Sequence, residues 1–460
     1  MPIRQIPGTD VQYFLTVFDE QGVERREADG TLLSDVVRQR VADAASPITD
    51  VFFTSHGWKG DVPAAIEQYD AWVGAMAKLE QDRAEARRRR KDFRPLIVGL
   101  HWPSLPWGDE AIPQPGRGGL LSADDDTLGR EVEAYAKRIA DTSAARAAIR
   151  TILEDARTRT TKKLPKKVKD AYATLFTESG LETDDRAAKP GADQPAFDPD
   201  AIIAEAGAGD AKPKTGEARA ATTPGVLGGF GGLGDKLGEL FRSPLRQLSF
   251  WKMKDRARSF GESGGHELLR SLQQAAPKAR FHLMGHSFGC IVVSATVAGG
   301  PNSQPLPRPV DSLFLVQGAL SLWAYAKEIP FERGTAGYFN RIIANGLVRG
   351  PIVTTRSTRD TAVGKLYPLG AKVKKQLVLG DDDLPRYGGI GSFGVQGMGA
   401  LAADLPMGAA TSSYGFKPGR VYNLEASKII KNGDGASGAH SDIAHPEVAH
   451  AFWQAILAEP

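Results

Sequence analysis

The chain of 460 residues contains a single cysteine, Cys290, so it cannot form an intrachain disulfide. A disulfide-stapled secreted fold is thereby excluded, and nothing points to an oxidising compartment. No apolar stretch approaches the roughly 20 residues that a membrane-spanning helix needs, and residues 1–5 lack the apolar region of a secretion signal. These absences predict a cytoplasmic protein in which Cys290 is a packed thiol rather than a reactive one.

The chain also lacks a large net charge and any cluster of metal-ligating residues. The net charge is only +3, which is too small to indicate a nucleic-acid partner. A basic run at 87–91 closes a helix expected to begin near Pro63, and we interpret it as a solvated helix end rather than an anion or membrane-surface site. The histidines do not pair at HExxH spacing, and one cysteine cannot build a zinc site. The sequence predicts neither a metal nor a cofactor.

What is present is a strand and helix alternation. Buried-strand patterns separated by helical patterns start at Val51 and predict an α/β fold with a mostly parallel central sheet flanked by helices. An opening hairpin of 11–18 and 23–27 brings the expected sheet to about eight strands. The other strands are expected near 51–55, 95–101, 280–284, 310–316, 351–355 and 420–424.

A long insertion at 107–249 interrupts the predicted core, which comprises 1–106 and 250–460. We interpret it as a cap or lid that begins with helices and includes a mobile linker. A glycine-rich apolar run at 224–234 suggests a lid or acyl-chain surface, and weak contact of the insertion with a membrane surface stays open. A smaller insertion is expected at about 378–417.

The most specific motif is the GHSFG pentapeptide at 285–289, centred on Ser287. A strand-like run at 281–284 precedes it, and a helix-like run of small residues at 291–297 follows it. This is the context of a nucleophile elbow, where a strand turns sharply into a helix and the flanking glycines relieve the crowding. We therefore predict that Ser287 is a nucleophile rather than only a helix cap.

An elbow requires backbone N–H donors for an oxyanion on a loop well upstream of the serine. The strand pattern at 51–54 leads directly into Ser55-His56-Gly57-Trp58, where the glycine lets the backbone turn toward the site. The N–H groups of Trp58 and Phe288 are the predicted donors.

Five residues are expected to line the substrate site around these donors. His56 and His286 adjoin the motif glycines, so we expect them to orient loops through hydrogen bonds rather than to transfer protons. Gly57 belongs to the same loop, and His101 and Trp102 end another strand at the same sheet edge.

The candidate acid is Asp360, in the loop that follows the strand pattern at 351–355. Its rivals are Glu425, just past the last strand, and the acidic run 381–383, which is more typical of a solvated loop.

The candidate base is His440, in a glycine-rich loop between the last strand and a helix opened by Pro446. Its rivals are His445, directly before that helix, and His450, inside it; both suit structural roles better.

Two GxGxxG matches occur, at Gly229, Gly231 and Gly234 and at Gly389, Gly391 and Gly394. Neither follows a convincing strand, as a dinucleotide fingerprint must, so we interpret both as flexible loops.

With its HGW and GHSFG motifs, the chain resembles the α/β-hydrolase superfamily, and bacterial serine esterases and lipases in particular. The resemblance covers the core but not the insertions. It implies that Ser287 attacks an acyl carbon, that His440 shuttles the proton, and that Asp360 fixes the histidine tautomer.

The expected activity is hydrolysis of a small-molecule or lipid-like carboxylic ester. The alternatives are a lipase, an acyl-thioesterase, a less favoured peptidase, and a catalytically silent scaffold that binds a partner. The acyl chain length, the leaving group and the oligomeric state stay open.

Overall fold

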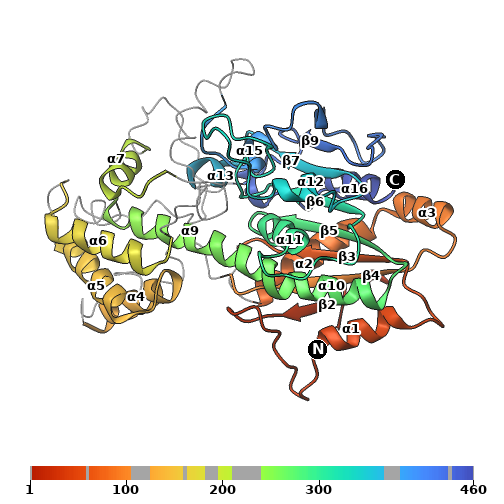
Figure 1. Ribbon diagram of the computed structural model, residues 1–460, viewed down its shortest axis with the longest axis horizontal. Coiled ribbons are helices and arrows are strands. Elements are labelled where there is room, and N and C mark those ends of the chain that lie inside the picture. The colour runs from red at the N-terminus through yellow and green to blue at the C-terminus, as the bar shows by residue number, and fades with distance from the viewer. Residues whose placement is uncertain are drawn as a thin grey trace. The chain divides into compact units, whose positions relative to one another are not determined.

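The computed structural model describes residues 3–58, 62–104, 125–158, 163–181, 195–209, 240–366, 384–433 and 438–458. These residues form two compact units. The first contains the described residues of Met1–Leu105 and Lys254–Pro460, and the second contains those of Pro106–Asp185 and Gln194–Met253. The first unit carries the sheet and the second is helical (Figure 1).

Within the described residues, nine strands form one sheet in the order β1-β2-β4-β3-β5-β6-β7-β9-β8. Only β1 and β2 pair antiparallel, and every other neighbouring pair is parallel. The strands are β1 (Ile3–Gln5), β2 (Gln12–Val17), β3 (Asp50–Ser55), β4 (Pro95–His101), β5 (Arg280–His286), β6 (Ser312–Val316), β7 (Ile352–Arg356), β8 (Ala402–Pro406) and β9 (Val421–Glu425). The predicted α/β class with a mostly parallel sheet is confirmed.

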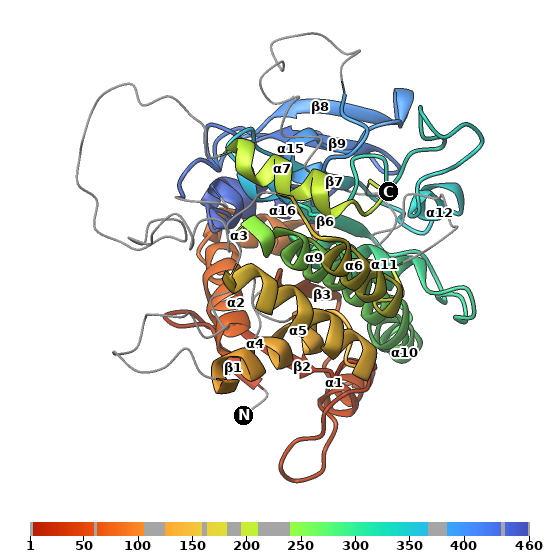
Figure 2. The same ribbon diagram turned by 90° about the vertical axis from the view of Figure 1, so that its left-hand side faces the viewer.

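Helices cover both faces of this sheet (Figure 2). The helices are α1 (Leu33–Ala42), α2 (Val62–Ala77), α3 (Glu80–Arg89), α10 (His266–Ala275), α11 (Gly289–Ala298), α12 (Asn340–Ala344), α13 (Thr361–Leu366), α15 (Ile390–Phe393) and α16 (Pro446–Ile456), with the π-helix η1 (Gly261–Gly265) and the short 3-10 helices η2 (Gly399–Leu401) and η3 (Ala439–Ser441). On one face α16 packs against α2 and α3, and on the other α11 packs against the central strands and α10. With both faces covered, the central strands are buried on successive residues rather than on alternate ones.

Three expectations about the elements of this unit are corrected. The strand that pairs with β2 in the sheet is β1 and not 23–27. The β1 strand pairs with Gln12–Phe14, whereas 23–27 makes only an isolated antiparallel bridge, from Glu24 to Phe18 just past the end of β2. The single helix expected from Pro63 to Lys91 is divided into α2 and α3 at Leu79, whose backbone is not helical.

The third correction is a ninth strand, β8, inside the predicted insertion at 378–417. Its sequence, AADLP, is short and half-exposed, and it ends in a proline that only an edge strand tolerates. Such a strand carries almost no periodic signal, so the sequence did not reveal it.

The second unit consists of helices α4 (Asp125–Arg138), α5 (Ser143–Thr158), α6 (Lys166–Glu178) and α7 (Pro199–Gly209), and of the first part of α9 (Ser243–Phe260). Apolar side chains of α5 and α6 form its core, among them Ile149, Ile152 and Tyr172. The run 224–234, expected as a lid or acyl-chain surface, lies outside the described residues. The role of this insertion as a cap stays a prediction.

No helix within the described ranges is both long enough and apolar enough to cross a membrane.

Candidate active site

The strand order places the carboxyl ends of β3 and β5 side by side at the centre of the sheet. From β3 the chain steps to β4 on one side, and it then returns to β5 on the other side of β3. Such a reversal opens a crevice outside the carboxyl edge of a parallel sheet, where ligands of this class of fold bind. The loops after β3 and β5 are those that carry Gly57 and Ser287.

Ser287 forms a sharp turn between β5 and α11. Its φ is +57°, a left-handed conformation that costs a non-glycine residue about 1–3 kcal/mol and is concentrated at functional sites. A Cβ on Gly285 would lie 2.3 Å from the Gly289 carbonyl oxygen, and one on Gly289 would lie 2.2 Å from the Ser55 carbonyl oxygen. Both motif glycines are therefore required by close packing of the backbone.

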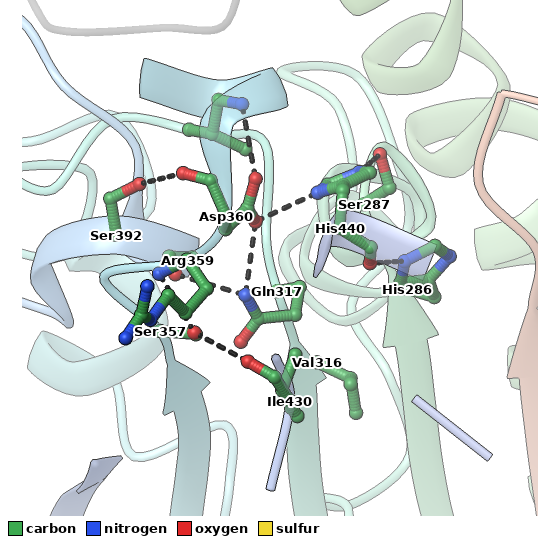
Figure 3. Close-up of polar contacts among 12 residues, drawn as sticks. His286, Ser287, Val316, Gln317, Ser357, Arg359, Asp360, Ser392, Ile430 and His440 are labelled. Atoms are coloured by element: carbon green, nitrogen blue, oxygen red, sulfur yellow. Dashed lines mark hydrogen bonds and ion pairs between the residues drawn. The ribbon is translucent and has the colours of Figure 1, made fainter. Parts of the chain in front are cut away.

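Three side chains from distant parts of the chain meet at this turn (Figure 3). His440 Nε2 lies 2.7 Å from Ser287 Oγ, and His440 Nδ1 lies 2.8 Å from Asp360 Oδ2. A backbone bridge between Asp360 and Gly438, together with a hydrogen bond from Ala439 N to Arg359 O at 3.1 Å, holds the two loops together. The histidine can accept the serine proton at Nε2 while its Nδ1–H donates to the carboxylate.

All three side chains are shielded from solvent. Asp360 is fully buried, and Ser287 and His440 are only 6% and 9% exposed. Shielding of this degree strengthens each hydrogen bond, because the local dielectric constant is low.

The surroundings of Asp360 include a residue that the sequence analysis missed. Gln317 follows β6 directly, is fully buried, and has a φ of +46°. Its Nε2 donates to Asp360 Oδ2 at 3.0 Å, while the backbone N–H of Val363 donates to Oδ1 at 3.3 Å. The carboxylate thus accepts hydrogen bonds at both oxygens. Only the strand-end position of Gln317 could have marked it in the sequence.

The predicted oxyanion loop lies directly against the elbow. A Cβ on Gly57 would lie only 2.8 Å from Ser287 Cβ and 3.1 Å from His286 Nδ1. The rings of Trp58 and Phe288 are in contact, with centroids 5.4 Å apart. The two predicted N–H donors therefore belong to neighbouring residues on the two loops.

His286 links these two loops to His440. Its Nε2 lies 3.0 Å from the His440 carbonyl oxygen, so it must donate there, and its Nδ1 accepts from Gln68 Nε2 at 2.7 Å. The Oε1 atom of Gln68 in turn accepts from the Gly57 N–H at 3.3 Å. Gln68, on α2, is a second residue that the sequence did not identify. Helical periodicity predicts only that it is half-buried and says nothing of its contact with His286.

The other predicted pocket residues lie beneath this surface. His56 and Trp102 are fully buried and stack with ring centroids 5.7 Å apart, and the ring of His101 lies 5.1 Å from that of His56. The hydroxyl of Tyr69 accepts from the His56 N–H at 2.8 Å, and burial raises the pKa of Tyr69 well above its usual range. These contacts support the shape of the loop; direct contact with a substrate stays a prediction.

The thiol of Cys290 is packed behind the elbow. It donates to the Gly285 carbonyl oxygen at 3.1 Å, and burial raises the pKa of Cys290 well above its usual range.

The rival residues have other partners. His450 lies between Asp82 and the Ser412 carbonyl oxygen, and His445 pairs with Asp442 at 2.8 Å. Burial lowers the pKa of His450, but its hydrogen bonds to these two partners outweigh burial and raise the pKa above its ordinary value.

Among the rival acids, Glu425 accepts hydrogen bonds from Ser427, and 381–383 lies outside the described residues.

The second GxGxxG match packs against Asp360. Its first glycine, Gly389, precedes α15, and Gly391 inside that helix would bring a Cβ to 3.0 Å from Asp360 Oδ2. The first match, 229–234, lies outside the described residues. In the part of the chain that the structure describes, no cluster of three or more His, Cys, Asp or Glu side chains could hold a metal ion.

Comparisons of the chain with protein-family models, with curated proteins and with solved structures gave no match.

Proposed function

We propose that this protein is a serine hydrolase of the α/β-hydrolase type that cleaves carboxylic esters through an acyl-enzyme, without a cofactor. One observation carries the proposal: two consecutive hydrogen bonds, of 2.7 and 2.8 Å, join Ser287 to His440 and His440 to Asp360. The elbow conformation of Ser287 and its place at the carboxyl edge of the sheet support the same conclusion.

In the proposed reaction, Ser287 Oγ attacks the acyl carbon while His440 Nε2 accepts its proton. The oxyanion that forms is stabilised by the N–H groups of Trp58 and Phe288. Collapse of this intermediate expels the alcohol, which takes the proton from His440. Water then attacks the acyl-enzyme by the same steps and releases the carboxylic acid and free Ser287. Asp360 holds the His440 tautomer and offsets the charge on the imidazolium.

The proposal is tested by hydrolysis of p-nitrophenyl esters of increasing acyl length, with Ser287→Ala as the matched control. We expect serine-dependent release, and a length preference that measures the depth of the acyl site. The control should keep the wild-type fold, because it removes one small hydroxyl and no core volume. Absence of turnover by the wild type, together with absence of covalent labelling by a fluorophosphonate, would refute the proposal.

Two further substrates distinguish the alternatives within the same chemistry. Acyl-thioester carriers should be preferred by a thioesterase, and activity that rises at a lipid interface would identify a lipase. A silent scaffold would cleave none of these substrates and would not be labelled.

A further inference from the structure

We propose that Gln317 is a positioning residue that fixes the carboxylate of Asp360 for the reaction. This inference rests on the proposed function, and the contacts of the Gln317 amide carry it. Nε2 donates to Asp360 Oδ2 at 3.0 Å and to the Gly391 carbonyl oxygen at 3.1 Å, which uses both of its hydrogens. Figure 3 shows the amide beside the carboxylate.

The other end of the amide is held as firmly. The Thr355 hydroxyl accepts from the backbone N–H of Gln317 at 3.0 Å and donates to the side-chain Oε1 of Gln317 at 2.9 Å. A flipped amide would place Oε1 against Asp360 Oδ2 and the Gly391 carbonyl oxygen, which are both acceptors. The orientation that donates to the acid is therefore the one that satisfies every partner.

The backbone of Gln317 gives independent support. Ser287 and Gln317 are the non-glycine residues with positive φ within the described residues, and they follow the neighbouring strands β5 and β6. A non-glycine residue stays in the left-handed conformation only where the surrounding structure holds it there, and such residues are concentrated at functional sites. Glycine at this position would relieve the strain and remove the donor.

The segment at Gly389–Gly394 completes the same arrangement. The Gly391 N–H donates to the Gly318 carbonyl oxygen at 2.9 Å, and the Gly391 carbonyl oxygen accepts from Ser357 N at 2.8 Å. A Cβ on Gly391 would lie 2.8 Å from the Gln317 carbonyl carbon and 3.0 Å from Asp360 Oδ2. The glycine thus leaves room for the carboxylate, and its carbonyl group orients the amide that binds it.

The test replaces Gln317 by methionine, which keeps the shape but removes the donor, and by glutamate, which sets a second carboxylate against the first. We expect Gln317→Met to lower kcat by about 10- to 100-fold, with KM unchanged within about twofold. Gln317→Glu should lower kcat by at least as much, because the two carboxylates repel each other. The matched control is Gln273→Met, a glutamine equally buried in α10, an element that carries none of the three side chains. All rates are divided by the active-site concentration from fluorophosphonate titration.

A double-mutant cycle separates positioning from general damage. In an Asp360→Asn background, Gln317→Met should change kcat by less than about twofold, because the carboxylate through which it acts is gone. Equal loss in both backgrounds, or wild-type kcat in Gln317→Met, would overturn the inference. If Gln317→Met does not fold, Thr355→Val, which removes the hydroxyl that orients the amide, should lower kcat in the same direction with KM unchanged.

Proton NMR gives a readout that needs no turnover. The Nδ1 proton shared by His440 and Asp360 should produce a far-downfield resonance that Asp360→Asn abolishes and Gln317→Met shifts. If the wild type cleaves no ester but this pattern is seen, the proposed function fails and the positioning role stands. An unshifted resonance in Gln317→Met refutes the positioning role whatever the activity.

Discussion

Replacement of Gly57 by alanine should separate the oxyanion loop from the nucleophile. The added Cβ would lie 2.8 Å from Ser287 Cβ and 3.3 Å from the His286 carbonyl oxygen, groups held in place by the turn into α11. An ordinary carbon–carbon contact is about 3.5–4.0 Å, so the loop must retreat by about 1 Å. Gly57 does not have a positive φ, so this contact, and not the backbone conformation, is the source of the effect.

A displacement of about 1 Å at a reacting centre can cost about 100-fold in rate, and we expect that loss in kcat for Gly57→Ala. The assay is hydrolysis of the best p-nitrophenyl ester, normalised to the fluorophosphonate-titrated serine, with the unfolding temperature measured in parallel. Gly129→Ala in α4 is the matched control, because its Cβ would meet no atom within 4 Å. The control should keep full activity and gain up to about 1 kcal/mol of stability. Wild-type kcat in Gly57→Ala would refute the assignment of the oxyanion donors to this loop.

Three further outcomes are expected. Asp360→Asn should lower kcat by about 10⁴-fold, by analogy with serine proteases, because an amide beside Nδ1 favours the histidine tautomer that cannot accept the serine proton; unimpaired turnover would move the acid elsewhere. Gln68→Leu should lower kcat by about tenfold, since it removes the donor to His286; unchanged kinetics would show that this link is dispensable. The pKa of His450 is raised in the folded state, so its pairing with Asp82 stabilises the fold fully below about pH 6.5 and is lost as the pH rises through the folded pKa. Urea unfolding across this range should therefore show wild type losing stability relative to His450→Gln as the pH increases, and parallel curves would contradict the pairing.

Local patterns in the sequence were enough to predict the central strands and the turn around Ser287. Five of the six central strands start within one residue of their predicted first residue, and β6 starts two residues later than predicted, because long apolar runs between turn signals leave little choice of structure. The sequence also placed Ser287, Asp360 and His440 each in a loop after a strand, and the structure brings the three side chains together. Parallel strands end at one edge, so residues that follow them converge there.

Contacts between distant segments were decided only by the tertiary structure. Gln317 and Gln68 lie 43 and 218 residues from the partners they bind, Asp360 and His286, and no local pattern distinguishes either from an ordinary glutamine. The strand β8 likewise exists only because β9 offers it an edge. Turn geometry and hydrophobic periodicity depend on residues that are close together in the sequence, so the sequence by itself determines them. Which amide meets which carboxylate depends on how the sheet brings separate loops together, and only the folded chain decides that.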